Sequence, residues 1–266
     1  MLIALSLFLL SLAGALALPL ACGFSLWWAV PLFLGLELLL HVLFVAWHWL
    51  FCLRGRDRAT PLEAIVPMGR RATRRISRLL CAYGGLRPRI LGEDKLPETP
   101  FLLVANHRSI FDPLMVMGFL DRHNISFVSK PENLRIPMIG DIAYAAGCLA
   151  IDRQNDREAL KTILRAADYL KRGLCSMGIY PEGHRSRSGA LEDFHAGSFK
   201  IAQRAGVPLV IAVTRGTEKL ARRLFLRPTT VELEILEVLP VEQVKALSTR
   251  ELSDYARGRI EHALGK

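Results

Sequence analysis

A histidine and an aspartate five positions apart are the first residues of this 266-residue chain that could do chemistry. His107 and Asp112 follow the apolar run 101–105, which predicts a buried strand. Asp112 and Pro113 predict a helix start, with the aspartate as N-cap and the proline in the first helical position. On a loop between a strand and a helix the two side chains can meet, and an imidazole held by a carboxylate is a general base with a fixed tautomer. The alternative is a plain loop histidine beside a helix cap.

Two further polar segments also follow predicted strands. Arg153 comes just after the short apolar run 148–151, where a guanidinium can bind a phosphate through two parallel hydrogen bonds. Its alternative is a surface ion pair with Asp152 or Glu158. The second segment, 180–186, reads Tyr-Pro-Glu-Gly-His-Arg-Ser, and its glycine permits close approach of the backbone to a ligand. An ordinary polar turn is the alternative there.

From Arg89 onward apolar runs alternate with amphipathic stretches, and this pattern predicts an α/β fold. Strands are expected at 90–92, 101–105, 125–129, 148–151, 175–180, 208–214 and 231–239. Helices are expected at 113–120, 132–146 with a break at Pro137 and Gly140, 155–173, 198–205 and 248–264. Asn155 with Glu158, and Ser248 with Glu251, have the spacing of helix-start pairs. The order predicts one mainly parallel central sheet with flanking helices.

The first 53 residues are almost free of charge, with no Lys or Arg and one acid, Glu37. Two apolar runs, 1–18 and 24–53, predict a helical membrane hairpin, and no basic segment precedes the first, which disfavours a cleaved signal peptide. All four tryptophans lie in the second run, at 27–28 and 47–49. About twenty residues of helix span roughly 30 Å, so the two pairs have the spacing of interfacial aromatic belts. Whether the hairpin crosses the bilayer or enters one leaflet stays open.

A polar stripe interrupts the second apolar run. Glu37, His41 and His48 share one helical face. We interpret the stripe as the face on which the hairpin packs, or as the face of a helix that lies partly in the membrane interface. A metal site built from these three side chains is the less favoured alternative.

Most of the formal net charge of +10 belongs to one segment, because residues 54–89 hold ten Arg and two acids. This segment follows the apolar hairpin directly, so an anionic membrane surface is favoured as its partner over nucleic acid. By the positive-inside rule it lies on the cytoplasmic side. Residues 62–82 predict an amphipathic helix whose basic face contacts lipid headgroups or is simply solvated. Its expected apolar side consists of Ile65, Met68, Ala72, Ile76, Leu79 and Leu80.

The cysteines indicate no disulfide framework. Five are present, an odd number, at wide spacings and without a Cys-x-x-Cys pair. A reduced compartment and no zinc site are therefore expected.

Four motifs in order carry a resemblance to a known family. They are Asn-His-x₄-Asp at 106–112, Gly-x₃-Ile-Asp-Arg at 147–153, aromatic-Pro-Glu-Gly-x-Arg-Ser at 180–186, and a Val-Pro-hydrophobic strand from 207. The set resembles the glycerolipid (lysophospholipid) acyltransferase family, and most nearly its bacterial 1-acyl-glycerol-3-phosphate acyltransferases, over about residues 87–240. The chain departs from the family pattern at two positions, because His184 stands where threonine is usual and His195 where lysine is common.

The resemblance implies transfer of a fatty acyl group from an acyl-CoA or acyl carrier protein thioester to the sn-2 hydroxyl of 1-acyl-glycerol-3-phosphate, giving phosphatidic acid in phospholipid biosynthesis. His107 would take the proton from the hydroxyl and Asp112 would hold the imidazole. A Ser109–His107 acyl-enzyme is a competing mechanism, against which the resemblance counts. Backbone amides are expected as oxyanion donors. No cofactor and no metal are expected, and the thioester is a co-substrate. Acceptor binding is assigned to Asn106, Arg153, Glu182, Gly183, Arg185 and Ser186.

The chain thus divides into a membrane-embedded hairpin at 1–53, an Arg-rich juxtamembrane segment at 54–86 and an α/β acyltransferase domain at 87–266. We expect it at the inner (cytoplasmic) membrane, with the catalytic domain on the cytoplasmic side and membrane lipids rather than nucleic acid as partners. Two other functions are considered. One is the same chemistry on a lysolipid with a different headgroup or on an amino-acid lysolipid. The other is a catalytically silent lipid-binding protein, which should lack His107, Asp112 or Glu182.

Overall fold

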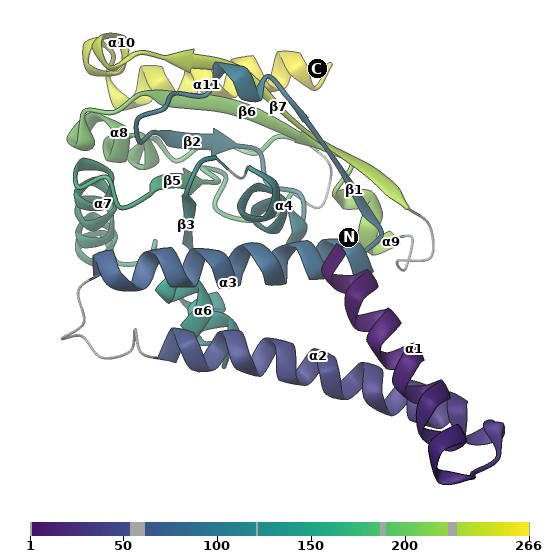
Figure 1. Cartoon of the computed structure of the whole chain (residues 1–266). Helices are drawn as coiled ribbons and strands as arrows, with labels where there is room; N and C mark the ends of the chain where they lie inside the picture. Colours follow the sequence, from purple (N-terminus) through teal and green to yellow (C-terminus); the bar gives the residue numbers. More distant parts are fainter. Residues whose placement is uncertain (1, 54–61, 121, 187–189, 223–227, 266) are drawn as a thin grey trace.

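A mainly parallel sheet organises the chain from residue 86 onward in the computed structural model, which describes residues 2–53, 62–120, 122–186, 190–222 and 228–265 (Figure 1). The described residues form seven strands in the order β1-β7-β6-β2-β5-β3-β4. The strands are β1 (Leu86–Leu91), β2 (Leu102–Ala105), β3 (Ile125–Ser129), β4 (Leu149–Ala150), β5 (Ser176–Ile179), β6 (Leu209–Arg215) and β7 (Thr229–Leu239).

The predicted α/β class is confirmed, with one difference in strand direction. All neighbouring strands pair in parallel except β6 and β7, which are antiparallel. Strand β1 pairs with β7 in parallel, so these two strands run opposite to the other five. Strand β7 alternates buried and partly exposed residues, as expected for a strand with one wet face, whereas β2 and β5 are buried throughout, as in sheets covered on both faces.

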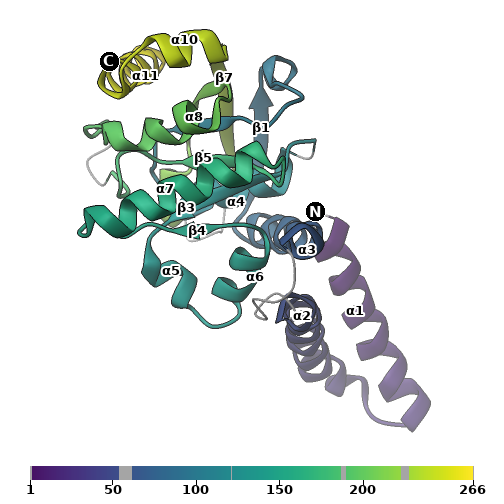
Figure 2. The same cartoon turned by 90° about the vertical axis from the view of Figure 1, so that its left-hand side faces the viewer.

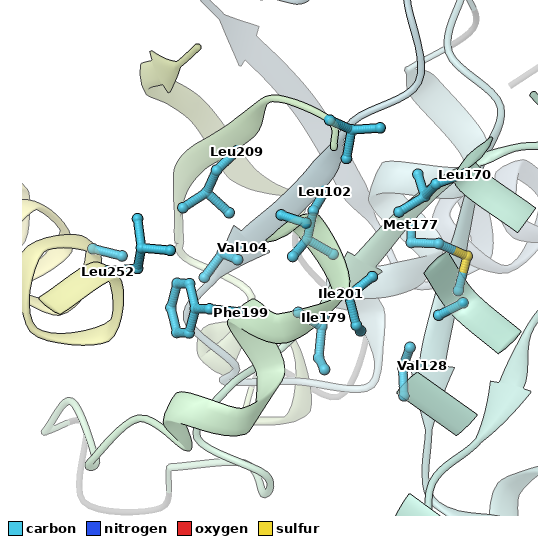
Figure 3. Close-up of a cluster of buried hydrophobic side chains, with 14 of the residues drawn as sticks. Leu102, Val104, Val128, Leu170, Met177, Ile179, Phe199, Ile201, Leu209 and Leu252 are labelled. Atoms are coloured by element: carbon cyan, nitrogen blue, oxygen red, sulfur yellow. The ribbon is translucent and has the colours of Figure 1, made fainter. Parts of the chain in front are cut away.

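Helices cover both faces of the sheet (Figures 1 and 2). Successive side chains of β2 point to opposite faces, so they belong to two different hydrophobic cores. Leu102 and Val104 belong to the core beneath α7, α8 and α11, which Figure 3 shows with Phe199 and Leu252. Leu103 belongs to the opposite core, beneath α4. These helices are α4 (Phe111–Phe119), α5 (Pro131–Arg135), α6 (Ile139–Ala145), α7 (Asp156–Lys171), α8 (Lys200–Ala205), α9 (Glu218–Arg222), α10 (Val241–Ala246) and α11 (Thr249–Ala263), with 3₁₀ turns at Glu93–Lys95 and Ala196–Phe199.

Helix boundaries follow the predicted caps at most places. Asn155 accepts a hydrogen bond from the Glu158 amide at 3.2 Å, and Ser248 begins α11 with a complete capping box. The predicted break in 132–146 is confirmed between α5 and α6, where Met138 has a φ of 65°. The prediction for Asp112 is wrong, because α4 begins at Phe111 and the N-cap position is Ile110. The Asp112 carboxylate bonds to the loop before the helix instead of capping it.

Two apolar helices precede the sheet domain, as predicted. They are α1 (Leu2–Cys22) and α2 (Ala29–Leu53), joined through a 3₁₀ turn at Leu26–Trp28, and they extend away from the sheet (Figure 1). Both are long and apolar enough to span a membrane, with mean hydropathies of 2.3 and 2.2, and many of their large apolar side chains are exposed. The three-part division of the chain itself stays a prediction.

The polar stripe of α2 packs inside the protein, in agreement with its favoured interpretation. Glu37 accepts hydrogen bonds from Ser11 of α1 at 2.7 Å and from the Tyr83 hydroxyl at 3.0 Å. The Tyr83 oxygen also lies 2.7 Å from Nε2 of His41. These contacts join α1, α2 and the end of α3 (Leu62–Tyr83), so that the hairpin is fixed to the domain at its polar face.

Helix α3 lies between the hairpin and the sheet in both views (Figures 1 and 2). Ala72 and Leu79 are buried as predicted, whereas Leu80 is exposed and the Ile65 side chain lies outside the described part. Gly69 permits close packing on α6, since a Cβ there would lie 2.1 Å from the Ala145 carbonyl carbon.

The basic residues of α3 are partly engaged by the protein itself. Arg78 donates to the Gly118 carbonyl at 2.6 Å, and Arg75 lies 3.4 Å from His48 of α2. The predicted basic cluster at Arg54, Arg56 and Arg58 lies outside the described residues. Contact of this segment with lipid headgroups stays a prediction.

Candidate active site

The loop from β2 to α4 brings His107 and Asp112 together. Nδ1 of His107 lies 2.8 Å from Oδ2 of Asp112, whose side chain is fully buried, while 18% of the His107 side chain is exposed. The same carboxylate oxygen accepts hydrogen bonds from the amides of Arg108 at 2.7 Å and Ser109 at 2.8 Å. Because the carboxylate can only accept, Nδ1 carries the proton and the lone pair of Nε2 is left for a substrate.

Aromatic rings fix the plane of the imidazole. The His107 ring stacks on Tyr180 with centroids 4.2 Å apart and an interplanar angle of 10°, and Tyr180 stacks in turn on Phe127. Burial, and next the charge of Asp112, raise the pKa of Tyr180 well above its ordinary value of 10.0, so its hydroxyl stays neutral. Oδ1 of Asp112 is buried with no hydrogen-bond partner in the described part of the chain.

Glu182 holds the backbone of the histidine loop. Its Oε1 accepts a hydrogen bond from the His107 amide at 2.6 Å, and its Oε2 accepts one from the Glu192 amide at 3.2 Å. The residue is 1% exposed, and burial raises the pKa of its carboxyl against the opposing effect of the two amides. Both oxygens of Glu182 therefore bond to the backbone, and its assignment to acceptor binding stays a prediction.

Asn106 and Ser186 also hydrogen-bond to the backbone around the histidine loop. The Asn106 amide group donates to the Thr214 carbonyl at 3.0 Å and its oxygen accepts from the Thr214 amide at 2.7 Å. The Ser186 amide donates to the His107 carbonyl at 3.0 Å, and its hydroxyl donates to the Ala190 carbonyl at 2.6 Å. Both residues are buried. Their predicted contact with the acceptor stays a prediction.

Gly183 and Arg153 lie in contact, as expected if both contribute to one binding site. Gly183 has a φ of 82°, and a Cβ there would lie 1.5 Å from Nη1 of Arg153 and 3.2 Å from Nε2 of His195. Arg153 donates to the Tyr180 carbonyl at 3.3 Å. Only glycine fits at this point, because the conformation is left-handed and the guanidinium occupies the space of a side chain.

The alternative ion pair of Arg153 is not formed. Asp152 accepts a hydrogen bond from the Gln154 amide, and Glu158 pairs with Lys161 at 2.7 Å. Among the described residues no carboxylate lies within ion-pair distance of Arg153, whose pKa is lowered by burial.

Two histidines, His184 and His195, lie beside the contact between Gly183 and Arg153. Burial, followed by the nearby charges of Arg153 and His184, lowers the pKa of His195 below its ordinary 6.5. Arg185 is exposed and makes no ion pair within the described ranges. The cluster can therefore receive an anion. His195 was not among the predicted site residues, although its departure from the family pattern marked it, and its place beside Arg153 depends on a contact 42 positions apart in the chain.

Ser109 does not have the geometry of a nucleophile activated by His107. Its Oγ accepts a hydrogen bond from the Phe111 amide at 3.3 Å and the residue is buried. No hydrogen bond joins this hydroxyl to the imidazole in the part of the chain that the structure describes. This arrangement counts against a Ser109 acyl-enzyme.

Comparisons with known proteins decide the family. The sequence model of the acyltransferase family matches residues 87–214, which include His107, Asp112, Arg153 and Glu182. The match places residues 87–214 in the acyltransferase family. The chain is an O-acyltransferase, and the resemblance seen in its motifs is confirmed. Together with the two apolar helices, the family indicates an enzyme associated with membranes.

Several curated relatives of this acyltransferase carry one name. The 1-acyl-sn-glycerol-3-phosphate acyltransferase of Salmonella typhimurium is 28% identical over 165 residues, covering 62% of this chain and 67% of that protein. The human 1-acyl-sn-glycerol-3-phosphate acyltransferase beta is 30% identical over 175 residues, 65% of this chain and 63% of that protein. The matched region thus spans about two thirds of these relatives.

A solved structure shares the fold of most of the chain. The 1-acyl-sn-glycerophosphate acyltransferase PlsC from Thermotoga maritima superposes with a TM-score of 0.63 at 22% sequence identity, covering 84% of this chain and 94% of that one. At this identity the likeness concerns the fold.

Proposed function

We propose that this acyltransferase transfers a fatty acyl group from an acyl-CoA or acyl carrier protein thioester to the sn-2 hydroxyl of 1-acyl-glycerol-3-phosphate. The product is phosphatidic acid, an intermediate of phospholipid biosynthesis. The names of the relatives support 1-acyl-glycerol-3-phosphate as the acceptor. The observation that carries the chemistry is the 2.8 Å contact between His107 and buried Asp112, which leaves Nε2 of the ring for the acceptor.

The reaction needs one proton relay. Nε2 of His107 takes the proton of the acceptor hydroxyl while the oxygen attacks the thioester carbonyl carbon. The tetrahedral intermediate then collapses, the carbon–sulfur bond breaks, and the imidazolium returns the proton to the departing thiolate. Asp112 stabilises the imidazolium throughout and holds the ring through Nδ1. The amides of Arg108 and Ser109 already bond to Asp112, so other donors must bind the oxyanion.

Arg153, Gly183 and Arg185 are proposed to bind the acceptor. Arg153 donates to the carbonyl of Tyr180, the residue whose ring stacks on His107, so a phosphate at the guanidinium lies next to the catalytic ring. Gly183 allows the backbone to approach this phosphate. Asn106, Glu182 and Ser186 act by holding the loop.

The apolar hairpin would bring this site to its lipids. We place the enzyme at the inner (cytoplasmic) membrane with its catalytic domain on the cytoplasmic side, because the Arg-rich segment follows the hairpin directly. Lysophosphatidic acid and anionic headgroups are then its lipid partners, with the acyl-CoA or acyl carrier protein thioester as co-substrate. No further cofactor enters this mechanism.

An assay of the purified full chain in detergent tests the proposal. Lysophosphatidate, lysolipids with other headgroups and an amino-acid lysolipid are each offered with acyl-CoA and with acyl carrier protein thioester, and products are read by mass spectrometry. We expect the highest kcat/KM with lysophosphatidate. A higher value with another acceptor would reassign the substrate, and no product with any pair would favour a silent lipid-binding protein.

A further inference from the structure

The connection between α5 and α6 presents two isoleucines at the surface of the sheet domain. Ile136 is 45% exposed and Ile139 is 58% exposed, and Pro137 between them is exposed as well. Single exposed apolar side chains are common on protein surfaces. The backbone that holds these two, and what lies next to them, therefore decide whether they have a partner.

A strained turn holds the isoleucines outward. The Ile139 amide donates to the Pro137 carbonyl at 2.8 Å, and Met138 between them has a φ of 65° and a ψ of −52°. This is the rare, strained form of the γ-turn, and Met138 is the one non-glycine residue with a positive φ in the described part of the chain. A Cβ on Gly140 would lie 2.0 Å from the Leu134 carbonyl oxygen, so the turn is packed closely onto α5.

The turn lies next to the apolar hairpin. Nε1 of Trp49 in α2 donates to Oδ2 of Asp141 at 2.8 Å, and Asp141 is only two residues after Ile139 in α6. Ile142 of α6 packs in one cluster with Cys52 of α2. Figure 2 shows the connection between α5 and α6 at the lower edge of the sheet domain, on the side from which the hairpin extends.

This end of α2 also presents large apolar side chains outward. Trp47 is 60% exposed and Leu50 is 56% exposed. The tryptophans at 47–49 form one of the two pairs whose spacing is that of interfacial aromatic belts. The start of α6 is therefore attached to α2 at the level expected for a membrane interface, and the two isoleucines extend the apolar surface of the hairpin onto the sheet domain.

Basic side chains lie beside the turn. Lys130 precedes α5 and Arg135 ends it, and both are exposed. Glu132, in the first turn of α5, is the acid of this short helix. Apolar side chains next to lysine and arginine are typical of segments that lie in the interface of an anionic membrane, with the apolar groups below the headgroups and the cations near the phosphates.

We propose that the turn between α5 and α6 is a second membrane contact of this enzyme. Ile136 and Ile139 enter the boundary between headgroups and acyl chains in the leaflet at the Leu53 end of α2. The contact holds the sheet domain at a point beside the hairpin and so limits its rotation about α2. This inference rests on the membrane location within the proposed function, and it does not depend on which lysolipid is the acceptor.

The test uses the full chain with single cysteines that carry the environment-sensitive dye nitrobenzoxadiazole. Cys22 is exposed and the other four cysteines are buried, so C22S is the background. Dye is attached to I136C and I139C in the turn, and to L38C on α2, where the leucine is 67% exposed. D254C is the matched control, because Asp254 is an exposed residue of α11, at the opposite end of the domain from the hairpin (Figure 1).

Each labelled protein is first shown to unfold at the temperature of C22S in detergent. It is then bound to vesicles of phosphatidylcholine with one-fifth phosphatidylglycerol, with and without lipid that carries a nitroxide near the top of its acyl chain. At positions 136 and 139 we expect blue-shifted emission and nitroxide quenching within about twofold of that at position 38, because both depths lie within reach of the nitroxide. D254C should show neither effect. Should one turn variant fold poorly, the other carries the test.

Three results would overturn the proposal. Water-like emission without quenching at both turn positions, with quenching at position 38, would reject the second contact and leave the membrane location of the hairpin intact. Water-like emission at position 38 as well would reject both. Blue-shifted emission at the turn that the nitroxide does not quench would mean that protein, and not lipid, covers the turn. Acyl transfer by C22S in detergent is measured separately, so that a failure of the proposed chemistry is distinguished from each of these results.

Discussion

Replacing Asp112 by Asn removes the charge beside His107 while nearly preserving the shape of the side chain. Oδ2 lies 2.8 Å from Nδ1, which places the centres of the two charges roughly 4 Å apart. At an effective dielectric constant of about 20, unit charges at this separation attract by about 4 kcal/mol. That attraction is present only when the imidazole is protonated, so its loss raises the barrier and should lower kcat by about 10³-fold.

The assay is steady-state acyl transfer by purified D112N in detergent, with acceptor and donor varied separately. The KM of the acceptor should change little, because Asp112 is fully buried and does not contact the acceptor. D168N is the matched control, since Asp168 is an exposed residue of α7 paired with Arg172, and its kcat should equal that of the parent. A folded D112N with kcat within about tenfold of the parent would refute the reasoning.

Three further changes test the surrounding site. G183A should lower the free energy of unfolding by about 1–2 kcal/mol and raise the acceptor KM. The reason is that the added methyl group overlaps Arg153 and that φ at this position is positive. An unchanged acceptor KM and an unchanged denaturation midpoint would contradict this prediction. R153A should raise the acceptor KM about tenfold or more and the donor KM much less, whereas R157A, an exposed arginine of α7, should change neither. Burial raises the pKa of Glu182 above its ordinary 4.5, so its ionisation removes stability as pH rises through the raised value. The unfolding free energy of E182Q relative to the parent should therefore increase with pH above about 4.5 in denaturant titrations, and a flat difference would be inconsistent with a raised pKa.

The contact between His107 and Asp112 could be predicted from the sequence because its geometry is local. His107 and Asp112 lie on one short loop between a buried strand and a helix, and residue types with their spacing define such a loop. The same local information misplaced the start of α4. An aspartate before a proline has the pattern of an N-cap, and only the folded loop shows its carboxylate turned back toward the Arg108 and Ser109 amides.

Roles that depend on distant partners could not be predicted. Glu182 binds the His107 amide 75 positions away, and Asn106 binds the Thr214 backbone 108 positions away. Sequence patterns identify these polar residues as unusual, but do not say whether a polar atom meets a substrate or the protein's own backbone. The antiparallel pairing of β6 and β7 could not be predicted for a similar reason. The alternation of buried and exposed residues in β7 predicts which face is exposed to solvent, but not whether the strand runs parallel or antiparallel to its neighbour.

The two apolar N-terminal helices, in contrast, could be predicted from the sequence. The apolar helices and the polar stripe of α2 were predictable because composition and helical periodicity are enough to define them. The stripe's partners, Ser11 and Tyr83, belong to other helices and became visible only in the structure.

The central claim is that His107 deprotonates the acceptor hydroxyl directly. The measurement that tests it most directly is acyl transfer to lysophosphatidate by purified H107A, made alongside vesicle binding by the same preparation. The account predicts turnover reduced at least about 10³-fold with vesicle binding retained. Turnover comparable to that of the parent chain would contradict it.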